Sequence, residues 1–207
     1  VRHVVGASLD RALVALEGAL RVAQVQAQGA LLAVHFDPIA LGLFQTPAEV
    51  GADIATAEGQ PLGLGLNFGG PYLGIFTARQ KHVHKLAGRI VGVTKDVDGT
   101  LAYVLTLRAR EQDIRRERAT SNICTAQALL AIMAGMYAVY HGPDGLRRIA
   151  VRTHAMPRAL AEGLRRLGHT VLNTSFFDTL HLRVAEGRGH EVLARAHQRR
   201  INLREHA

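Results

Sequence analysis

The chain has 207 residues, of which 48% are hydrophobic and 20% charged, and 25 Lys and Arg against 17 Asp and Glu leave a net charge of +8. This composition excludes a disordered tail or a low-complexity linker, and the length suffices for one domain or two small ones. The single cysteine, Cys124, excludes an intrachain disulfide and a cysteine-rich zinc site, so a reducing compartment is expected.

The positive charge raises the question of a nucleic-acid or membrane partner. The chain has no Trp, only 5% aromatic residues and no unbroken basic run, so it lacks stacking surfaces and basic arms. Residues 123–140 are mostly apolar and near the minimum length of a membrane-spanning helix. Thr125 and Gln127 within them favour a buried helix instead. We therefore expect no nucleic-acid partner and no membrane span.

The N-terminal part has the pattern of an open α/β sheet. Residues 9–28 repeat apolar side chains every three or four positions, which predicts an amphipathic helix. The continuous apolar run 30–36 predicts a strand covered on both faces, and Asp37-Pro38 ends it. Ligands of such sheets bind beyond the carboxyl ends of the strands.

Residues 47–74 are rich in glycine and predict a long irregular loop, followed by a strand at 72–78. The spacing Gly63-x-Gly65-x-x-x-Gly69 is one residue off the dinucleotide fingerprint, and no later acidic residue on a second strand completes it. A nicotinamide site is therefore not expected.

Residues 88–107 predict a β-hairpin, because two β-rich runs flank Asp98-Gly99, a pair that favours a type I′ turn. The arginine-rich stretch 108–118 that follows predicts a helix, with Glu111 and Arg115 spaced for an ion pair. Its arginines indicate either a solvated helix face or an anion-binding or interface role, and the sequence leaves both open.

The C-terminal part predicts a second, smaller α/β unit. A helix over 123–140 stops at Gly142-Pro143, and a further helix continues to about residue 167. After it come predicted strands, a helix and a last strand, at 169–175, 177–184, 189–200 and 201–203. We divide the chain into residues 1–144, a partial large α/β domain, and residues 145–207, a truncated small α/β domain.

No constellation of residues predicts chemistry by itself. His82 and His84 alternate, but no third ligand stands at a recognisable spacing, so no metal site is expected. No Ser sits in a Gly-x-Ser-x-Gly elbow. Cys124 follows a candidate helix N-terminus, which would lower its pKa, yet a small buried hydrophobic residue is the simpler interpretation.

Longer motifs carry a resemblance to a family. The run REQDIRRERATSNICTAQ (110–127) and MYAVYHGP (136–143) are similar to glycine dehydrogenase (decarboxylating), the P-protein of the glycine cleavage system. GADIATAEGQPLG (51–63), NFGGPYLG (67–74), GRIVGVTKD (88–96) and SFFDTLHLRV (175–184) extend the similarity over most of the chain.

The resemblance implies an α/β protein of the aspartate-aminotransferase-like fold (fold type I) that depends on pyridoxal 5′-phosphate. The implied activity is the loss of CO₂ from glycine and transfer of the aminomethyl group to the lipoyl carrier protein (H-protein), with the cofactor as electron sink. In this family two homologous halves, fused or separate, assemble together. Only one of them carries the lysine that binds the cofactor.

This sequence resembles the half without that lysine. The matching stretch holds Gln60 and Pro61, and an amide or a proline ring cannot supply the amine that captures an aldehyde. The resemblance therefore implies no catalytic or cofactor-binding residue in this chain. Asp37 stands where the fold places the acid that pairs with the pyridinium nitrogen, but here we expect it simply to end the strand. The residues expected to line the active site or to contact the partner half are Gly69, Gly70, Arg110, Arg115, Arg116, Thr120, Ser121 and Asn122.

We accordingly expect a fragment, a degenerate copy or a chain that needs its partner, in the cytoplasm or the mitochondrial matrix. The expected partners are the half that bears the cofactor, the lipoyl carrier protein and glycine. The alternative is a non-catalytic structural or interaction module derived from the same family.

Overall fold

The computed structural model describes residues 23–24, 26–86, 88–119 and 127–205. Its centre is a three-stranded sheet in the order β1-β2-β3, made of β1 (Ala33–Phe36), β2 (Ile54–Glu58) and β3 (Gly74–Ala78). β1 and β2 are parallel, with Ala33 paired to Ile54, and β3 runs antiparallel to β2. The α/β class is therefore as predicted, with a mixed sheet.

The described residues do not cover β1 on both faces, so that expectation is wrong for this part of the chain. Burial alternates along the strand: Val34 and Phe36 are half-buried, and Ala33 and His35 are exposed. The predicted long loop over 47–74 is also wrong in part, because β2 lies within it. β2 buries Ala55 and Ala57, and a strand whose buried face is alanine has little apolar contrast. The predicted helix over 9–28 lies mostly outside the described residues.

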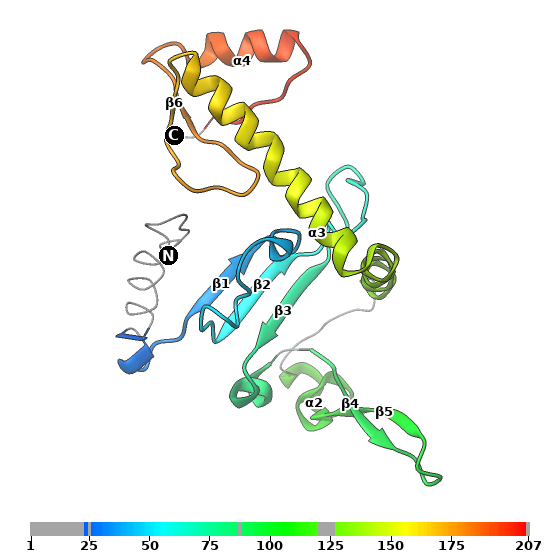
Figure 1. Cartoon of the computed structure of the whole chain (residues 1–207). Helices are drawn as coiled ribbons and strands as arrows, with labels where there is room; N and C mark the ends of the chain where they lie inside the picture. The colour runs from blue at the N-terminus through cyan, green and yellow to red at the C-terminus, as the bar shows by residue number, and fades with distance from the viewer. Residues whose placement is uncertain (1–22, 25, 87, 120–126, 206–207) are drawn as a thin grey trace.

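The hairpin is present, with β4 (Ile90–Lys95) paired to β5 (Leu101–Thr106), and it projects away from the sheet (Figure 1). Its turn is not type I′. Lys95 pairs with Leu101, the Gly99 amide donates to the Asp96 carbonyl, and only Gly99 has a positive φ, of 79°. This is a longer loop built on a type I turn. Asp96 favours it, since its Oδ1 accepts the amides of Asp98 and Thr100, each at 2.9 Å.

The stretch 108–118 is not one helix. It forms three short turns: η3 (Arg108–Arg110), α2 (Gln112–Arg115) and η4 (Arg116–Arg118). Left-handed backbone at Leu107 and Arg116, with φ of 57° and 53°, interrupts any continuous helix. The expected Glu111–Arg115 ion pair is replaced by other contacts: Glu111 pairs with Arg110, and the Arg115 Nε donates to the Ala109 carbonyl at 3.0 Å.

The long helix α3 (Ala128–Arg166) contains the predicted break. Gly142, with φ 60° and ψ 179°, separates two helical segments, and Pro143 begins the second of them. Figure 1 shows α3 crossing one end of the sheet, with the C-terminal elements at its far end. The domain boundary after residue 144 lies just beyond this break and stays a prediction.

The C-terminal elements are smaller than predicted. β6 (Thr170–Val171) and β7 (Leu182–Arg183) form a two-residue ladder, and α4 (Gly189–Gln198) follows. Residues 201–203 are not a strand. An aromatic cluster joins this unit to the rest: the His154 ring on α3 stacks on Phe177, and Phe44 contacts both rings edge-on. The His154 Nδ1 lies 2.8 Å from the Phe177 carbonyl.

The packed core is small, and no large side chain among the described residues is fully buried. One cluster joins the glycine-rich loop to α3: Leu64 and Leu73 pack against Leu130 and Ala134. A second contact joins η1 (Ala40–Gly42) to α3, where Gly42 faces Ala150. The described residues therefore hold together through a few close contacts with α3.

Replacing Gly42 by alanine tests that second contact. A Cβ at Gly42 would lie 2.7 Å from the Ala150 Cβ and 3.2 Å from the Arg147 Cα, so the helix would have to shift. We expect G42A to lower the free energy of unfolding by about 1–3 kcal/mol, as overpacking does, measured by urea denaturation. The matched control is G74A, because a Cβ there meets no atom within 4 Å. Equal stability of the two variants would contradict the packing argument.

Candidate functional site

The carboxyl ends of the parallel strands β1 and β2 lie at one edge of the sheet, where ligands of open α/β sheets bind. Asp37 follows β1, and Glu58 ends β2. The Asp37 Oδ1 accepts the Ile39 amide at 2.7 Å, and its carbonyl accepts the Ala40 amide, so Asp37 ends β1 and starts η1. The structure thus agrees with the expectation that this acid ends the strand.

Glu58 fixes the start and the end of the glycine-rich loop. Its Oε1 accepts the backbone amides of Gln60 and Leu73, each at 2.9 Å. The Gly59 amide donates to the Leu73 carbonyl at 2.6 Å, and a Cβ at Gly59 would lie 2.9 Å from the Leu73 side chain. The Gln60 Nε2 donates to the Gly65 carbonyl at 3.0 Å. Gln60 is therefore engaged in holding the loop.

The residues at this edge do not fit a covalently bound aldehyde cofactor. The segment 59–73 contains no lysine, and the three lysines of the chain are Lys81, Lys85 and Lys95. All three follow β3, whose C-terminal end lies at the opposite edge of the sheet because β3 is antiparallel to β2. Within the part of the chain that the structure describes, no lysine lies in the segment that follows β2 at the carboxyl edge.

The tip of the loop holds the predicted Gly69 and Gly70. Four consecutive residues have positive φ: Asn67 (45°), Phe68 (53°), Gly69 (101°) and Gly70 (150°). Only glycine adopts the last two conformations readily, which explains the Gly-Gly pair. The loop presents Leu66, 80% exposed, and Phe68, fully exposed, away from the described core.

The predicted arginines lie at the other end of the sheet. The Arg110 guanidinium donates to the carbonyls of Val83, His84 and Gly88, at 3.1–3.4 Å. Its Nε lies 3.2 Å from the Oε1 of Glu111, whose side chain is only 7% exposed. Arg110 thus ties the connection after β3 to the base of the hairpin. The structure does not bring it together with Gly69 and Gly70.

Arg115 and Arg116 are exposed, and Arg116 makes no ion pair within the described part of the chain. Thr120, Ser121 and Asn122 lie outside the described residues, as does Cys124. Among the described residues no group of three or more His, Cys, Asp and Glu could hold a metal ion. The helices described there include none long and apolar enough to cross a membrane.

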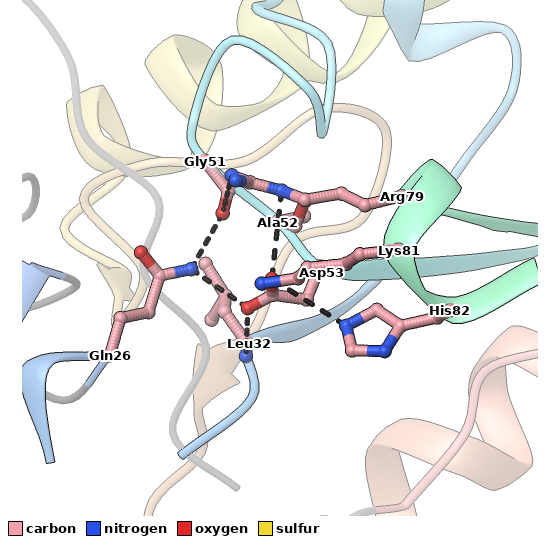
Figure 2. A network of polar contacts seen from close by, with 8 residues as sticks. All are labelled: Gln26, Leu32, Gly51, Ala52, Asp53, Arg79, Lys81 and His82. Carbon is pink, nitrogen blue, oxygen red and sulfur yellow. Dashed lines mark hydrogen bonds and ion pairs between the residues drawn. The ribbon is translucent and has the colours of Figure 1, made fainter. Parts of the chain in front are cut away.

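The sequence analysis missed Asp53, whose side chain is 2% exposed and joins three segments (Figure 2). Its Oδ2 accepts the Leu32 amide at 3.1 Å and the Gln26 Nε2 at 2.8 Å. Its Oδ1 lies 2.9 Å from the Lys81 Nζ, with Arg79 and His82 at 3.6 and 4.0 Å. Asp53 lies at the amino-terminal end of β2, and Glu58 lies at its carboxyl end. Asp53 is therefore away from the carboxyl edge, and its contacts stabilise the fold. Asp53 stands just before β2, whose apolar pattern is weak, so nothing in the sequence marked this carboxylate as a structural residue.

Lys81, followed by the Leu32 amide and Gln26, holds the pKa of the Asp53 carboxyl well below its usual value. A lowered pKa in the folded state means that this carboxylate stabilises the protein above the unfolded-state pKa of about 3.9. That contribution is lost as the pH falls below it. We expect D53N to unfold at a lower midpoint temperature than wild type at pH 7. This difference in midpoint should shrink below pH 4. The control is D98N at the exposed hairpin turn, and equal midpoints for both would contradict the role of Asp53.

Comparisons with known proteins agree with the motifs and the fold. The family model "Glycine cleavage system P-protein" matches residues 18–207. The chain belongs to this family. It is 53% identical over 178 residues to a glycine dehydrogenase (decarboxylating) of Nostoc sp. (strain PCC 7120), covering 86% of this chain and 18% of that relative. Its identity to the same enzyme of Xanthomonas euvesicatoria is 52% over 180 residues, covering 87% and 19%.

A solved structure supports the fold of the described elements. The crystal structure of a glycine decarboxylase (P-protein) of the glycine cleavage system, in inhibitor-bound form, matches with a TM-score of 0.80 at 36% identity. The match covers 89% of this chain and 43% of that one. The chain thus spans less than a fifth of the curated relatives and less than half of the solved chain.

Proposed function

We propose that this chain is part of glycine dehydrogenase (decarboxylating), in the half that lacks the cofactor lysine. It would act with the lysine-bearing half to decarboxylate glycine and pass the aminomethyl group to the lipoyl carrier protein. Pyridoxal 5′-phosphate would be bound by the partner half, in a fold type I assembly. The expected compartment is the cytoplasm or the mitochondrial matrix.

One observation carries the proposal. This chain retains the motifs of the family, and the turn after its strand β2 has Gln60-Pro61. The Glu58 carboxylate accepts the amides of Gln60 and Leu73, and the Gly59 amide donates to the Leu73 carbonyl, which closes the turn. Imine formation requires a free amine, and this turn offers none. The chain therefore provides a scaffold at the carboxyl edge, and the amine must come from elsewhere.

The sequence-predicted site residues receive different roles in this proposal. Gly69 and Gly70 shape the loop at the carboxyl edge, where they would line the shared site. Arg115 and Arg116 are exposed guanidinium groups suited to contacts with the partner half. Arg110 holds backbone carbonyls and would act on the fold. Thr120, Ser121 and Asn122 keep the role of lining or interface residues.

Cofactor capture tests the proposal. Incubation of the purified chain with equimolar pyridoxal 5′-phosphate, followed by gel filtration, should leave no cofactor absorbance in the protein fraction, and borohydride should fix no adduct in the mass spectrum. The lysine-bearing half, treated identically, serves as the positive control. A 1:1 adduct on one of the three lysines of the wild-type chain would overturn the assignment of the cofactor to the partner.

A further inference from the structure

The tip of the β4–β5 hairpin, which projects away from the sheet (Figure 1), carries an Asp-Gly pair. The sequence has two such pairs, Asp98-Gly99 at this tip and Asp144-Gly145 in α3. Among aspartyl sequences Asp-Gly cyclises most readily, because glycine has no Cβ to hinder attack of its nitrogen on the preceding carboxyl group. The two pairs share this reactivity, so a difference between them must come from the fold around each.

The loop around Asp98 leaves the pair free to react. Asp98 and Gly99 are exposed, the preceding Val97 side chain is fully exposed, and a Cβ at Gly99 would meet no atom within 4 Å. Within the described residues the Asp98 carboxylate has no hydrogen-bond or ion-pair partner. The Gly99 amide donates to the Asp96 carbonyl at 3.1 Å. This bond must break before the nitrogen can rotate toward the Asp98 Cγ, and it lies in an exposed loop.

The second pair is held by helix packing that opposes the same rotation. Asp144 lies in α3 just after the break at Gly142, and Gly145 is buried. A Cβ at Gly145 would lie 2.9 Å from the His141 Cβ, so the backbone is closely packed here. A helical residue keeps its ψ near about −42°, which holds the nitrogen of the next residue away from its own side chain. Cyclisation at Asp144 would therefore require unwinding the start of the second helical segment.

We propose that Asp98-Gly99 is a site of spontaneous isomerisation to isoaspartate, and that the fold protects Asp144-Gly145 from it. The Gly99 nitrogen forms a bond to the Asp98 Cγ, and the carboxyl hydroxyl leaves with the amide proton as water. A second water then opens the five-membered succinimide ring at either carbonyl. Opening at the former main-chain carbonyl gives isoaspartate, in which the main chain runs through Cβ and Cγ. Water is the sole co-reactant, and the inference is independent of the proposed function.

Isoaspartate changes the turn at the hairpin tip. The Asp96 Oδ1 accepts the amides of Asp98 and Thr100, and the Asp96 amide donates to the Thr100 carbonyl, all at 2.9 Å. One extra main-chain carbon between Asp98 and Thr100 moves the Thr100 amide and carbonyl away from these positions. The ladder of β4 and β5 starts beyond the loop, at Lys95 and Leu101, so the change is confined to the tip.

Ageing of the full chain in water labelled with ¹⁸O tests the proposal. The chain is kept for several weeks at neutral pH and physiological temperature and is then digested in ordinary water. Mass spectrometry measures the ¹⁸O retained by the peptides that contain Asp98 and Asp144, and electron-based fragmentation distinguishes isoaspartate from aspartate. The matched variant is D98E. It keeps the negative charge and the main-chain amide that donates to Asp96, but its longer side chain cannot close a five-membered ring.

In the folded chain we expect labelled isoaspartate to accumulate at residue 98 and residue 144 to stay unlabelled. In guanidinium chloride, which removes the protection by the fold, both residues should react at comparable rates. Hydrogen exchange of residues 96–100 should become faster in the aged wild-type chain and stay unchanged in aged D98E. Absence of label at residue 98 in the folded chain, or equal label at both residues, would overturn the inference. Either result would leave the proposed function standing, because that function makes no use of this turn.

Discussion

Mixing this chain with the lysine-bearing half of the family is expected to produce glycine–bicarbonate exchange that the chain alone does not show. The turn after β2 has no amine, and Gln60 is engaged with the Gly65 carbonyl, so this turn offers the cofactor no covalent attachment. Loss of a covalent nucleophile lowers turnover by on the order of a thousandfold or more. The measurement is incorporation of labelled bicarbonate into glycine, with the carrier protein present.

Two controls separate catalysis by the pair from other sources. A lysine-bearing half whose cofactor lysine is replaced by alanine should give no exchange with this chain. The Q60K variant of this chain, tested alone, should also remain inactive, because Glu58 and Gly59 still hold the turn closed against Leu73. If the two wild-type components bind each other and still give no exchange, the chain is the non-catalytic module that the sequence left as the alternative.

Local rules predicted the elements with strong signals. Gly142-Pro143 marked the break in α3, because a glycine with positive φ followed by a proline cannot continue one regular helix. The hairpin was predicted from its β-rich runs, but its turn type depended on the Asp96 side chain, which the Asp98-Gly99 pair does not reveal. β2 was missed because its buried residues, Ala55 and Ala57, are barely apolar.

The candidate site was predicted less well than the fold, since it depends on contacts between distant residues. The absence of a lysine from residues 59–73 could be read from the sequence alone. The hydrogen bond that closes this turn could not be predicted, because it joins Glu58 to Leu73 across 15 positions. Arg110 illustrates the same limit: its motif suggested a residue that lines the active site or contacts the partner half, and only the folded chain shows its guanidinium on the carbonyls of Val83, His84 and Gly88.

Replacing Arg110 by alanine is expected to lower the free energy of unfolding by about 3 kcal/mol. The change leaves the carbonyls of Val83, His84 and Gly88 without this donor, and it leaves the nearly buried Glu111 carboxylate without the guanidinium beside it. The stability of R110K should lie between those of wild type and R110A, because one ammonium cannot span the positions that the planar guanidinium reaches. Urea denaturation followed by tyrosine fluorescence gives the stability, and hydrogen exchange of residues 80–118 locates the loss.

The control for this prediction is R116A, because Arg116 is exposed and belongs to the same motif. It should change stability by no more than about 0.5 kcal/mol. In the assembled pair, R110A should lose exchange activity only as far as it loses folded chain, and activity should recover at temperatures where the variant is folded. An R110A chain that is as stable as wild type and yet inactive with its partner would show that Arg110 reaches the substrate site. The guanidinium would then have to leave these carbonyls when the two halves meet.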